Sequence, residues 1–226
     1  MIQLFALHID PILTDKQLTH LLSFVDRAKR EKIVRYHRRI DAKRSLLADL
    51  LIRMQIAKRF EVDPRELQFA YNQYGKPYLQ GHPQVHFNLS HAGEWVVGML
   101  GCEEIGVDVE CIKELDHRIT DVVFSEAEMA LYQELPENRR QHYFYKIWTA
   151  KESYVKAVGK GLSISPQSIT VCMEEHQSYI VGKKKQIRHY TWVPDYVLCA
   201  CVERVELPTD IIYVEENAIY GYYEVL

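Results

Sequence analysis

The chain of 226 residues is long enough for one large domain or for two fused half-size domains with a substantial core. Its hydrophobic fraction of 47% and charged fraction of 26% are typical of a soluble globular protein, and no stretch approaches the roughly 20 continuous apolar residues of a membrane-spanning helix. The net charge of −3 argues against nucleic acid as a partner.

The first half is expected to begin with a buried strand over residues 2–9, without the basic leader of a secretory signal, which favours a cytoplasmic protein. Thr14 has the character of a helix N-cap, and apolar residues at helical spacing follow over 18–25. A basic, helical segment is predicted over 27–39, and a longer helix over about 41–60.

The middle of the chain reads as strands and turns. Residues 74–77, with the sequence Tyr-Gly-Lys-Pro, are a turn signature. Alternating apolar and polar residues predict strands over 85–90, 95–100 and 105–111.

The second half is predicted to continue with helices and then strands. A capping box at 125–128 opens a short helix, and a second helix runs from about 139 to 158, ending at Gly159. Strands are then expected at about 168–173, 187–193, 197–204 and 211–214. Since helices precede strands in both halves, the pattern hints at a duplicated α+β plan.

The five cysteines are an odd number, and none forms a CxxC pair. Cys199 and Cys201 would share one face of a strand, which is a poor spacing for zinc ligands. We therefore expect buried, free thiols in a reducing compartment.

The strand over 105–111 carries two carboxylates. Its alternation places Asp108 and Glu110 side by side on one polar face. Two carboxylates on the wet face of an edge strand need no metal, and for this short motif alone that interpretation is favoured. Two like charges at this distance repel, however, and a bound cation such as Mg²⁺ would offset the repulsion.

A third carboxylate comes from the helix over 139–158. Glu152 lies four residues after Trp148 and four before Lys156, so the three side chains share one helix face. Glu152 and Lys156 could form a surface ion pair worth less than ~1 kcal/mol. The neighbouring aromatic residues argue against full exposure, so a metal is a plausible partner for Glu152 and a phosphate for Lys156.

Two further segments are ambiguous. Ser90 and His91 form either a simple turn or a phosphate-binding elbow, and Lys76 is ambiguous in the same way. Nine Lys or Arg residues between 27 and 44 form either a solvated helix face or a grip on a multiply phosphorylated ligand. The lysines at 183–185 are expected in a loop that could dock an acidic partner.

Taken together, these residues resemble the 4′-phosphopantetheinyl transferases of the Sfp type. The blocks that carry the resemblance are residues 74–77, 87–91, 106–110 and 148–156, with residues 29–32 and 44–45. As an ordered set they are specific, and the similarity extends over nearly the whole chain.

The resemblance implies an α/β (α+β) fold with pseudo-twofold symmetry, in which two similar halves, residues 1–105 and 106–226, hold the active site in the cleft between them. It implies transfer of phosphopantetheine from coenzyme A to a serine hydroxyl of an apo peptidyl or acyl carrier protein, releasing adenosine 3′,5′-bisphosphate. A cytoplasmic monomer that serves nonribosomal peptide or antibiotic synthesis is the matching expectation.

Carried over residue by residue, the resemblance assigns the Mg²⁺ ligands to Asp108, Glu110 and Glu152. The coenzyme A contacts would be Lys29, Lys32, Arg44, Ser45, Lys76, Ser90, His91, Val109 and Lys156. The catalytic groups would be Glu152, Lys156 and His91, with Glu152 as the candidate acceptor of the serine proton. Residues from about 160 to 190 would contact the carrier protein.

Two alternatives remain open from the sequence. A Mg²⁺-dependent phosphohydrolase could use the same carboxylates with water as the nucleophile. A non-catalytic relative could bind carrier proteins without turnover, although such a protein need not retain Asp108, Glu110, Glu152 and Lys156 together.

Overall fold

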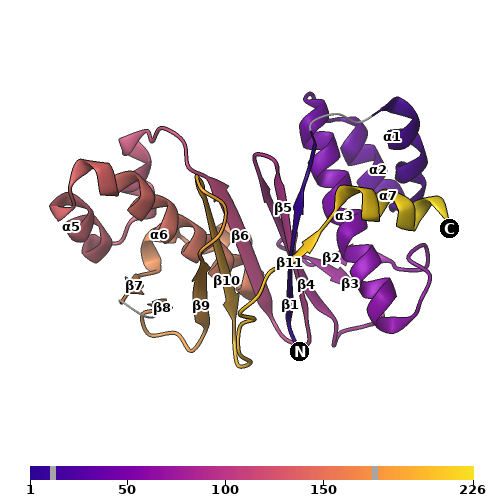
Figure 1. Cartoon of the computed structure of the whole chain (residues 1–226). Coiled ribbons are helices and arrows are strands. Elements are labelled where there is room, and N and C mark those ends of the chain that lie inside the picture. Colours follow the sequence, from indigo (N-terminus) through magenta and orange to yellow (C-terminus); the bar gives the residue numbers. More distant parts are fainter. Residues whose placement is uncertain (11–13, 175–177) are drawn as a thin grey trace.

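The computed structural model describes residues 1–10, 14–174 and 178–226. It has two large sheets with helices on their outer sides and a small two-stranded sheet formed by residues 69–71 and 77–79 (Figure 1). The first sheet has the strand order β11-β1-β5-β4, and the second has the order β6-β10-β9-β8-β7. In the described part of the chain, no helix has both the length and the apolar character that crossing a bilayer requires.

The first half begins with strand β1 (Gln3–His8) and helix α1 (Asp15–Leu21). Thr14 caps α1 as predicted, in a capping box with Gln17. The predicted basic helix over 27–39 is wrong in extent, because α2 (Arg27–Val34) ends before α3 (Arg39–Phe60) begins. The extended backbone of Arg38 separates the two helices.

The remaining elements of the first half are strands, joined by short turns. They are β2 (Phe69–Tyr71), β3 (Pro77–Leu79), β4 (His86–Ala92) and β5 (Trp95–Gly101). Gly75 forms the predicted turn between β2 and β3 with φ 87°, a left-handed conformation that glycine adopts without strain. Strand β4 begins one residue later and ends two residues later than the predicted strand over 85–90, and it therefore includes His91.

The second half is built around one long helix. Its elements are β6 (Ile105–Cys111), α4 (Thr120–Val123), α5 (Glu126–Glu134), α6 (Glu137–Val158), β7 (Val171–Met173), β8 (Ser178–Ile180), β9 (Gln186–Tyr190) and β10 (Tyr196–Val202). The capping box at Ser125 and the left-handed Gly159 after α6 are as predicted. The short strand β8 was not predicted, and the strand expected over about 168–173 is confirmed only for its second half, because Ser168 ends a 3₁₀ turn and β7 begins at Val171.

The last segment of the chain returns to the first half. Strand β11 (Ile212–Val214) pairs in parallel with β1, and helix α7 (Glu216–Glu224), which was not predicted, packs Ile219 and Tyr223 into the first core. The Tyr223 hydroxyl donates a 2.8 Å hydrogen bond to the carbonyl of Leu50. Residues 212–224 thus belong in space with the first sheet, although the sequence placed them with residues 106–226.

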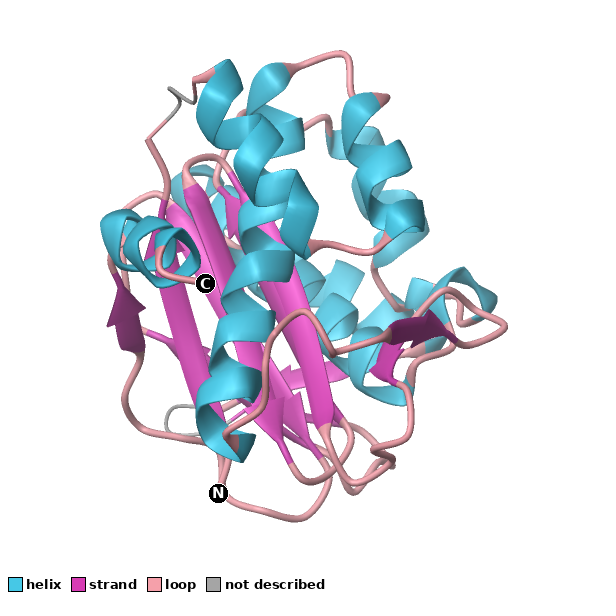
Figure 2. Ribbon diagram, turned by 90° about the vertical axis from the view of Figure 1, so that its right-hand side faces the viewer, coloured by secondary structure: helices cyan, strands magenta, loops and turns pink. Residues whose placement is uncertain are grey.

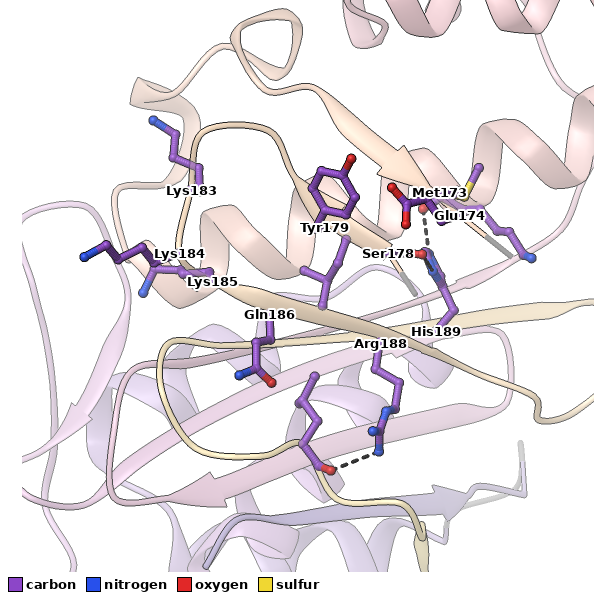
Figure 3. Close-up of a pocket in the computed structure, with 13 residues that line it drawn as sticks. Met173, Glu174, Ser178, Tyr179, Lys183, Lys184, Lys185, Gln186, Arg188 and His189 are labelled. Carbon is purple, nitrogen blue, oxygen red and sulfur yellow. Dashed lines mark hydrogen bonds between the residues drawn. The ribbon is translucent and has the colours of Figure 1, made fainter. Parts of the chain in front are cut away.

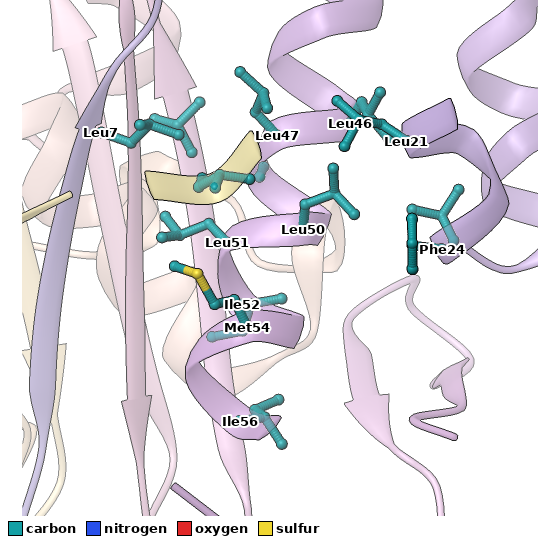
Figure 4. Packing of buried hydrophobic residues seen from close by; sticks show 14 of the residues in the cluster. Leu7, Leu21, Phe24, Leu46, Leu47, Leu50, Leu51, Ile52, Met54 and Ile56 are labelled. Atoms are coloured by element: carbon teal, nitrogen blue, oxygen red, sulfur yellow. The ribbon is translucent and has the colours of Figure 1, made fainter. Parts of the chain in front are cut away.

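Each sheet has its own core against a long helix. In the first half, Leu47 and Leu51 of α3 lie toward Leu7 of β1, and Leu46 lies beside Leu21 of α1 (Figure 4). Figure 2 shows the helices of this half lying across the face of the sheet. The apolar residues of α3 are therefore buried in the first core, and α6 covers the second sheet in the same way.

A third core joins the two sheets. Val97 and Met99 of β5 meet Val107 and Val109 of β6 and Leu198 of β10, and all five are at most 1% exposed. The apolar face of β6 is therefore used to join the halves, and its polar face is left for α6. The cysteines are free as expected, although Cys102 is exposed rather than buried.

Candidate functional site

The cleft between the halves lies where β4, β6 and α6 meet α2. A cavity of about 460 Å³ opens there and is lined from both halves. The charged and hydroxyl side chains around it are those of Lys29, Lys32, Tyr36, Ser45, Asp49, Tyr71, Ser90, Asp108, Glu110, Glu152 and Lys156, with His91 beside them. Nine of the predicted site residues therefore line one cavity, because the junction of the two sheets brings distant segments together.

The acidic face of β6 is covered by α6 and is not a wet strand edge. Asp108 is only 4% exposed. The close approach depends on Gly106, since a Cβ there would lie 1.9 Å from the Ser153 carbonyl oxygen and 2.5 Å from the Ala157 nitrogen. Glycine at this position lets β6 lie directly against the helix that carries Glu152 and Lys156.

Lys156 is the cation at the centre of the cleft. Its Nζ donates to Asp108 Oδ1 at 2.6 Å, to Ser90 Oγ at 2.9 Å and to the Val107 carbonyl at 3.2 Å. Ser90 Oγ in turn donates to Asp108 Oδ1 at 2.9 Å. The predicted exposed ion pair between Glu152 and Lys156 is therefore not the arrangement found, because Lys156 reaches across to β6.

The other two carboxylates lie beside this pair. Trp148 Nε1 donates to Glu110 Oε1 at 3.2 Å. Burial and then the charge of Asp108 raise the pKa of Glu110, and the same two causes raise the pKa of Glu152. The cleft thus concentrates three carboxyl groups around one ammonium, and the ionised forms of Glu110 and Glu152 are disfavoured.

The carboxylate oxygens of Asp108, Glu110 and Glu152 are the kind of ligand that a hard divalent cation prefers. Asp108 Oδ2 is buried and has no hydrogen-bond partner among the described residues, so one carboxylate oxygen is left for a further ligand. All three carboxyl groups offer oxygen, which Mg²⁺ prefers. Within the described residues, however, no three His, Cys, Asp or Glu side chains lie close enough to form a metal cluster as they stand. The metal-ligand assignment therefore stays a prediction.

Ser90 and Asn88 connect the two halves through backbone groups of β6. The Val107 N–H donates to Asn88 Oδ1 at 2.9 Å, and the Val109 N–H donates to Ser90 Oγ at 3.4 Å. The Val109 side chain is 1% exposed in the core between the sheets. Only the backbone of Val109 therefore faces the site that the sequence assigned to it.

His91 lies beside the cavity at the end of β4. The surrounding protein lowers the pKa of His91 by desolvation, and the charges of Lys156, Arg44 and Lys29 lower it further. The imidazole is accordingly favoured in its neutral form, in which it can donate one hydrogen bond to an anion.

Of the four predicted phosphate contacts on α2 and α3, three line the cavity. Lys29, Lys32 and Ser45 line it, and burial lowers the pKa of Lys29 although the nearby Asp49 opposes this. Arg44 does not line the cavity. Its guanidinium is held by the Gly93 carbonyl at 2.6 Å and by Asp41 at 2.7 Å.

Lys76 lies on an adjoining cavity of about 330 Å³ and not on the first one. Its ammonium donates to the carbonyls of Ala157 at 3.0 Å and Ile105 at 3.3 Å. Burial lowers the pKa of Lys76 to about 8. The walls of this second cavity are largely apolar. Trp148, Glu152 and Lys156 line both this cavity and the first one.

A separate cavity of about 650 Å³ lies on the second half and contains the lysine run at 183–185 (Figure 3). Lys185 is paired there with Glu104 at 3.1 Å and with Glu203 at 3.4 Å. His189, also in this cavity, has its pKa lowered to about 4 by burial. The predicted loop is confirmed for all three lysines, which lie between β8 and β9, and Lys185 is ion-paired within it.

Four residues with polar side-chain groups in the cleft were not predicted as site residues. Tyr36, Asp49, Tyr71 and Trp148 line the main cavity. Trp148 carried a usable signal, because it shares a helix face with Glu152. The other three gave none, since their position depends on how α2, α3 and β2 pack.

Comparisons with known proteins agree in both halves. Residues 12–102 match the family model "4′-phosphopantetheinyl transferase, N-terminal", and residues 104–201 match that of the 4′-phosphopantetheinyl transferase superfamily. The chain is 32% identical over 222 residues to the 4′-phosphopantetheinyl transferase ffp of Bacillus subtilis, covering 96% of this chain and 99% of that protein.

Two more relatives extend the comparison. The chain is 30% identical over 217 residues to the 4′-phosphopantetheinyl transferase Sfp of Bacillus subtilis strain 168, covering 94% of this chain and 97% of the relative. It is 37% identical over 166 residues to the 4′-phosphopantetheinyl transferase gsp of Aneurinibacillus migulanus, covering 74% of this chain and 69% of that protein.

Proposed function

The chain belongs to the 4′-phosphopantetheinyl transferase superfamily, and we propose that its cleft carries out the Mg²⁺-dependent transfer of phosphopantetheine from coenzyme A to a serine hydroxyl of an apo peptidyl or acyl carrier protein. The predictions of a 4′-phosphopantetheinyl transferase and of an α+β fold with two transferase-like halves are confirmed. Adenosine 3′,5′-bisphosphate is the leaving group of the proposed reaction.

One observation carries the proposal most directly. Lys156 from the second half meets Ser90 of the first half and Asp108 of β6 within 2.9 Å, at the junction of the two sheets. A hydroxyl, an ammonium and a carboxylate at one point can bind a pyrophosphate and the metal that accompanies it. Phosphoryl transfer depends mainly on such positioning and charge stabilisation.

The two walls of the cavity divide the work of binding coenzyme A. On one wall, Lys29, Lys32 and Ser45 supply charge and a hydroxyl for the phosphate on the adenosine. On the other wall, Lys156 and Ser90 would hold the pyrophosphate, and the neutral His91 would donate one hydrogen bond to it. Lys156 then stabilises the negative charge that develops on the departing bisphosphate.

Asp108, Glu110 and Glu152 would hold Mg²⁺. The buried Asp108 Oδ2, which has no hydrogen-bond partner among the described residues, supports this assignment because it can accept a further ligand. Burial and then the charge of Asp108 raise the pKa values of the two glutamates, and a bound cation would offset both effects. When bound, the metal supplies a Lewis acid that neutralises pyrophosphate oxygens.

The serine proton needs an acceptor, and Glu152 is the proposed one. Glu152 lines the main cavity on the same face of α6 as Lys156, where a bound carrier serine could reach its carboxylate directly or through a water. Trp148 donates to Glu110 and thereby gives that carboxylate a separate hydrogen-bond partner. Of the two glutamates, Glu152 is thus the better placed to take a proton.

The proposed function is tested by incubating several apo carrier proteins with the enzyme, coenzyme A and Mg²⁺, and by measuring their intact mass. We expect each served carrier to gain one phosphopantetheine group with the wild type and none with Asp108→Ala. Phosphopantetheine released into solution without a carrier would support the hydrolase alternative instead.

The metal is tested separately by thermal unfolding. Mg²⁺ at about 100 times its dissociation constant should stabilise the wild type by about 2.7 kcal/mol and leave Asp108→Ala unchanged.

The pathway that the enzyme serves is tested by comparing the transfer rates for carriers from peptide, polyketide and fatty-acid systems. Residues 160–190 stay the proposed carrier contact, to be tested by the KM for the carrier.

A further inference from the structure

Strand β6 has one edge that no other strand covers. In the described part of the second sheet, β6 is the terminal strand and pairs only with β10. The backbone groups of alternate residues on such a strand point away from the partner, and they need other partners when they are buried. On β6 these are groups of Ile105, Val107 and Val109.

Four side chains take the place of a neighbouring strand. Asn88 accepts from the Val107 N–H at 2.9 Å, and Ser90 accepts from the Val109 N–H at 3.4 Å. Lys156 donates to the Val107 carbonyl at 3.2 Å, and Lys76 donates to the Ile105 carbonyl at 3.3 Å. Three of the four side chains come from the first half, so the free edge of β6 is the joint between the halves.

Asn88 differs from the other three in chemistry. Ser90 and Lys156 also contact Asp108, and both lysines carry a charge. Asn88 is uncharged, 5% exposed and bonded to β6 through Val107, the residue before Asp108. Its Oδ1 is therefore committed to the backbone of β6.

We infer that Asn88 is a positioning residue for the transfer reaction. Asn88 lies on β4 and accepts the Val107 N–H of β6. This bond fixes the position of β6 relative to β4 at which Asp108 contacts Ser90 and Lys156. A buried N–H that loses its acceptor favours a shift of the strand that restores a partner. Such a shift would move Asp108 and Glu110 together, because both follow Val107 on the same strand.

The inference rests on the proposed function and predicts different effects on kcat and on the affinity for coenzyme A. The adenosine-side grip of Lys29, Lys32 and Ser45 lies on α2 and α3 and does not depend on β6. Loss of the Asn88 acceptor should therefore reduce kcat strongly and the affinity for coenzyme A only slightly. A merely structural role would instead reduce the amount of folded enzyme and leave both constants unchanged.

The experiment compares Asn88→Leu, which has no acceptor, with Asn88→Asp, which keeps one. We expect Asn88→Leu to lower kcat at least tenfold, to change the dissociation constant of coenzyme A less than threefold, and to speed amide exchange at Val107 at least tenfold by NMR. Asn88→Asp should keep kcat within threefold and Val107 protected. The matched control is Tyr223→Phe, which removes a 2.8 Å side-chain bond to the Leu50 carbonyl in the first core, lines neither cavity of the cleft, and should keep kcat within twofold.

Two results would overturn the inference. One is an Asn88→Leu enzyme with kcat within twofold of the wild type, and the other is an Asn88→Asp enzyme that loses kcat more than tenfold while Val107 stays protected. If Asn88→Leu does not fold, the Asn88→Asp outcome alone decides. A wild type that transfers nothing to any carrier rejects the proposed function, and the exchange of Val107 then still tests the bond.

Discussion

Lys156 Nζ lies 2.6 Å from Asp108 Oδ1, although the two residues are 48 positions apart and belong to different elements. Asp108 is 5% exposed in its side chain and Lys156 is 26% exposed, so the pair lies at the inner end of an open cleft. The ammonium offsets part of the charge of three carboxyl groups while it remains accessible to a substrate. The stability and the activity of the protein therefore depend on the same pair.

Replacement of Lys156 by methionine should destabilise the protein by about 3–5 kcal/mol at neutral pH, because a buried carboxylate loses its cation. Part of this loss should be recovered at pH 5, since the carboxyl groups of the variant bind protons there. Urea unfolding at both pH values measures the effect, with the exposed Lys160→Met as control. An equal loss at both pH values would show that charge is not the cause.

Replacement of Gly106 by alanine should separate β6 from α6. The new Cβ meets backbone atoms of Ser153 and Ala157, which cannot move away as a side chain could. We expect a loss of about 1–3 kcal/mol in unfolding free energy and at least a tenfold loss of transfer activity. In Gly221→Ala the new Cβ meets no atom within 4 Å, and helix propensity predicts a gain of up to about 1 kcal/mol there. Similar Tm changes in both variants would contradict the packing argument.

Replacement of Glu152 by glutamine should stabilise the protein while it abolishes transfer. Because the folded-state pKa of Glu152 is raised, its ionisation opposes folding once the pH exceeds the ordinary carboxyl range. The stability contribution of this group is thus present at low pH and lost as the pH rises through the folded-state pKa. We expect a gain of about 1 kcal/mol at pH 7 and none at pH 3.5, measured by thermal unfolding without Mg²⁺. A variant less stable than the wild type at pH 7 would reject this account.

Replacement of Lys76 by methionine should change how stability depends on alkaline pH. The folded-state pKa of about 8 lies below the ordinary value of 10.5, so the unfolded chain binds one more proton between these values. Wild-type stability therefore contains a term that rises from pH 8 to pH 10.5, and this term, on the order of 2 kcal/mol, should be absent from Lys76→Met. Urea unfolding at pH 7.5 and 10 measures the difference between the two proteins, which cancels the other titrating groups. Parallel pH profiles would place the ammonium in water and not at the carbonyls of Ile105 and Ala157.

Much of the local structure could be predicted from periodicity. The alternation of residues 105–111 placed Asp108 and Glu110 on one face, and the helical repeat placed Trp148, Glu152 and Lys156 on another. Capping and turn residues gave the beginnings of α1 and α5, and both ends of α6 within two residues. These features follow from bonds and steric preferences between near neighbours in the chain, which the sequence displays directly.

The sequence by itself thus determined which side chains share a face within each element, and which blocks match the transferase family. Only the tertiary structure decided that the acidic face of β6 meets α6, that Lys156 bonds to Asp108 and not to Glu152, and that Lys76 faces backbone carbonyls. It also decided that β11 and α7 return to the first half. The physical reason is that contacts between distant segments depend on how whole faces pack, as the approach permitted by Gly106 illustrates, and no short-range pattern encodes that packing.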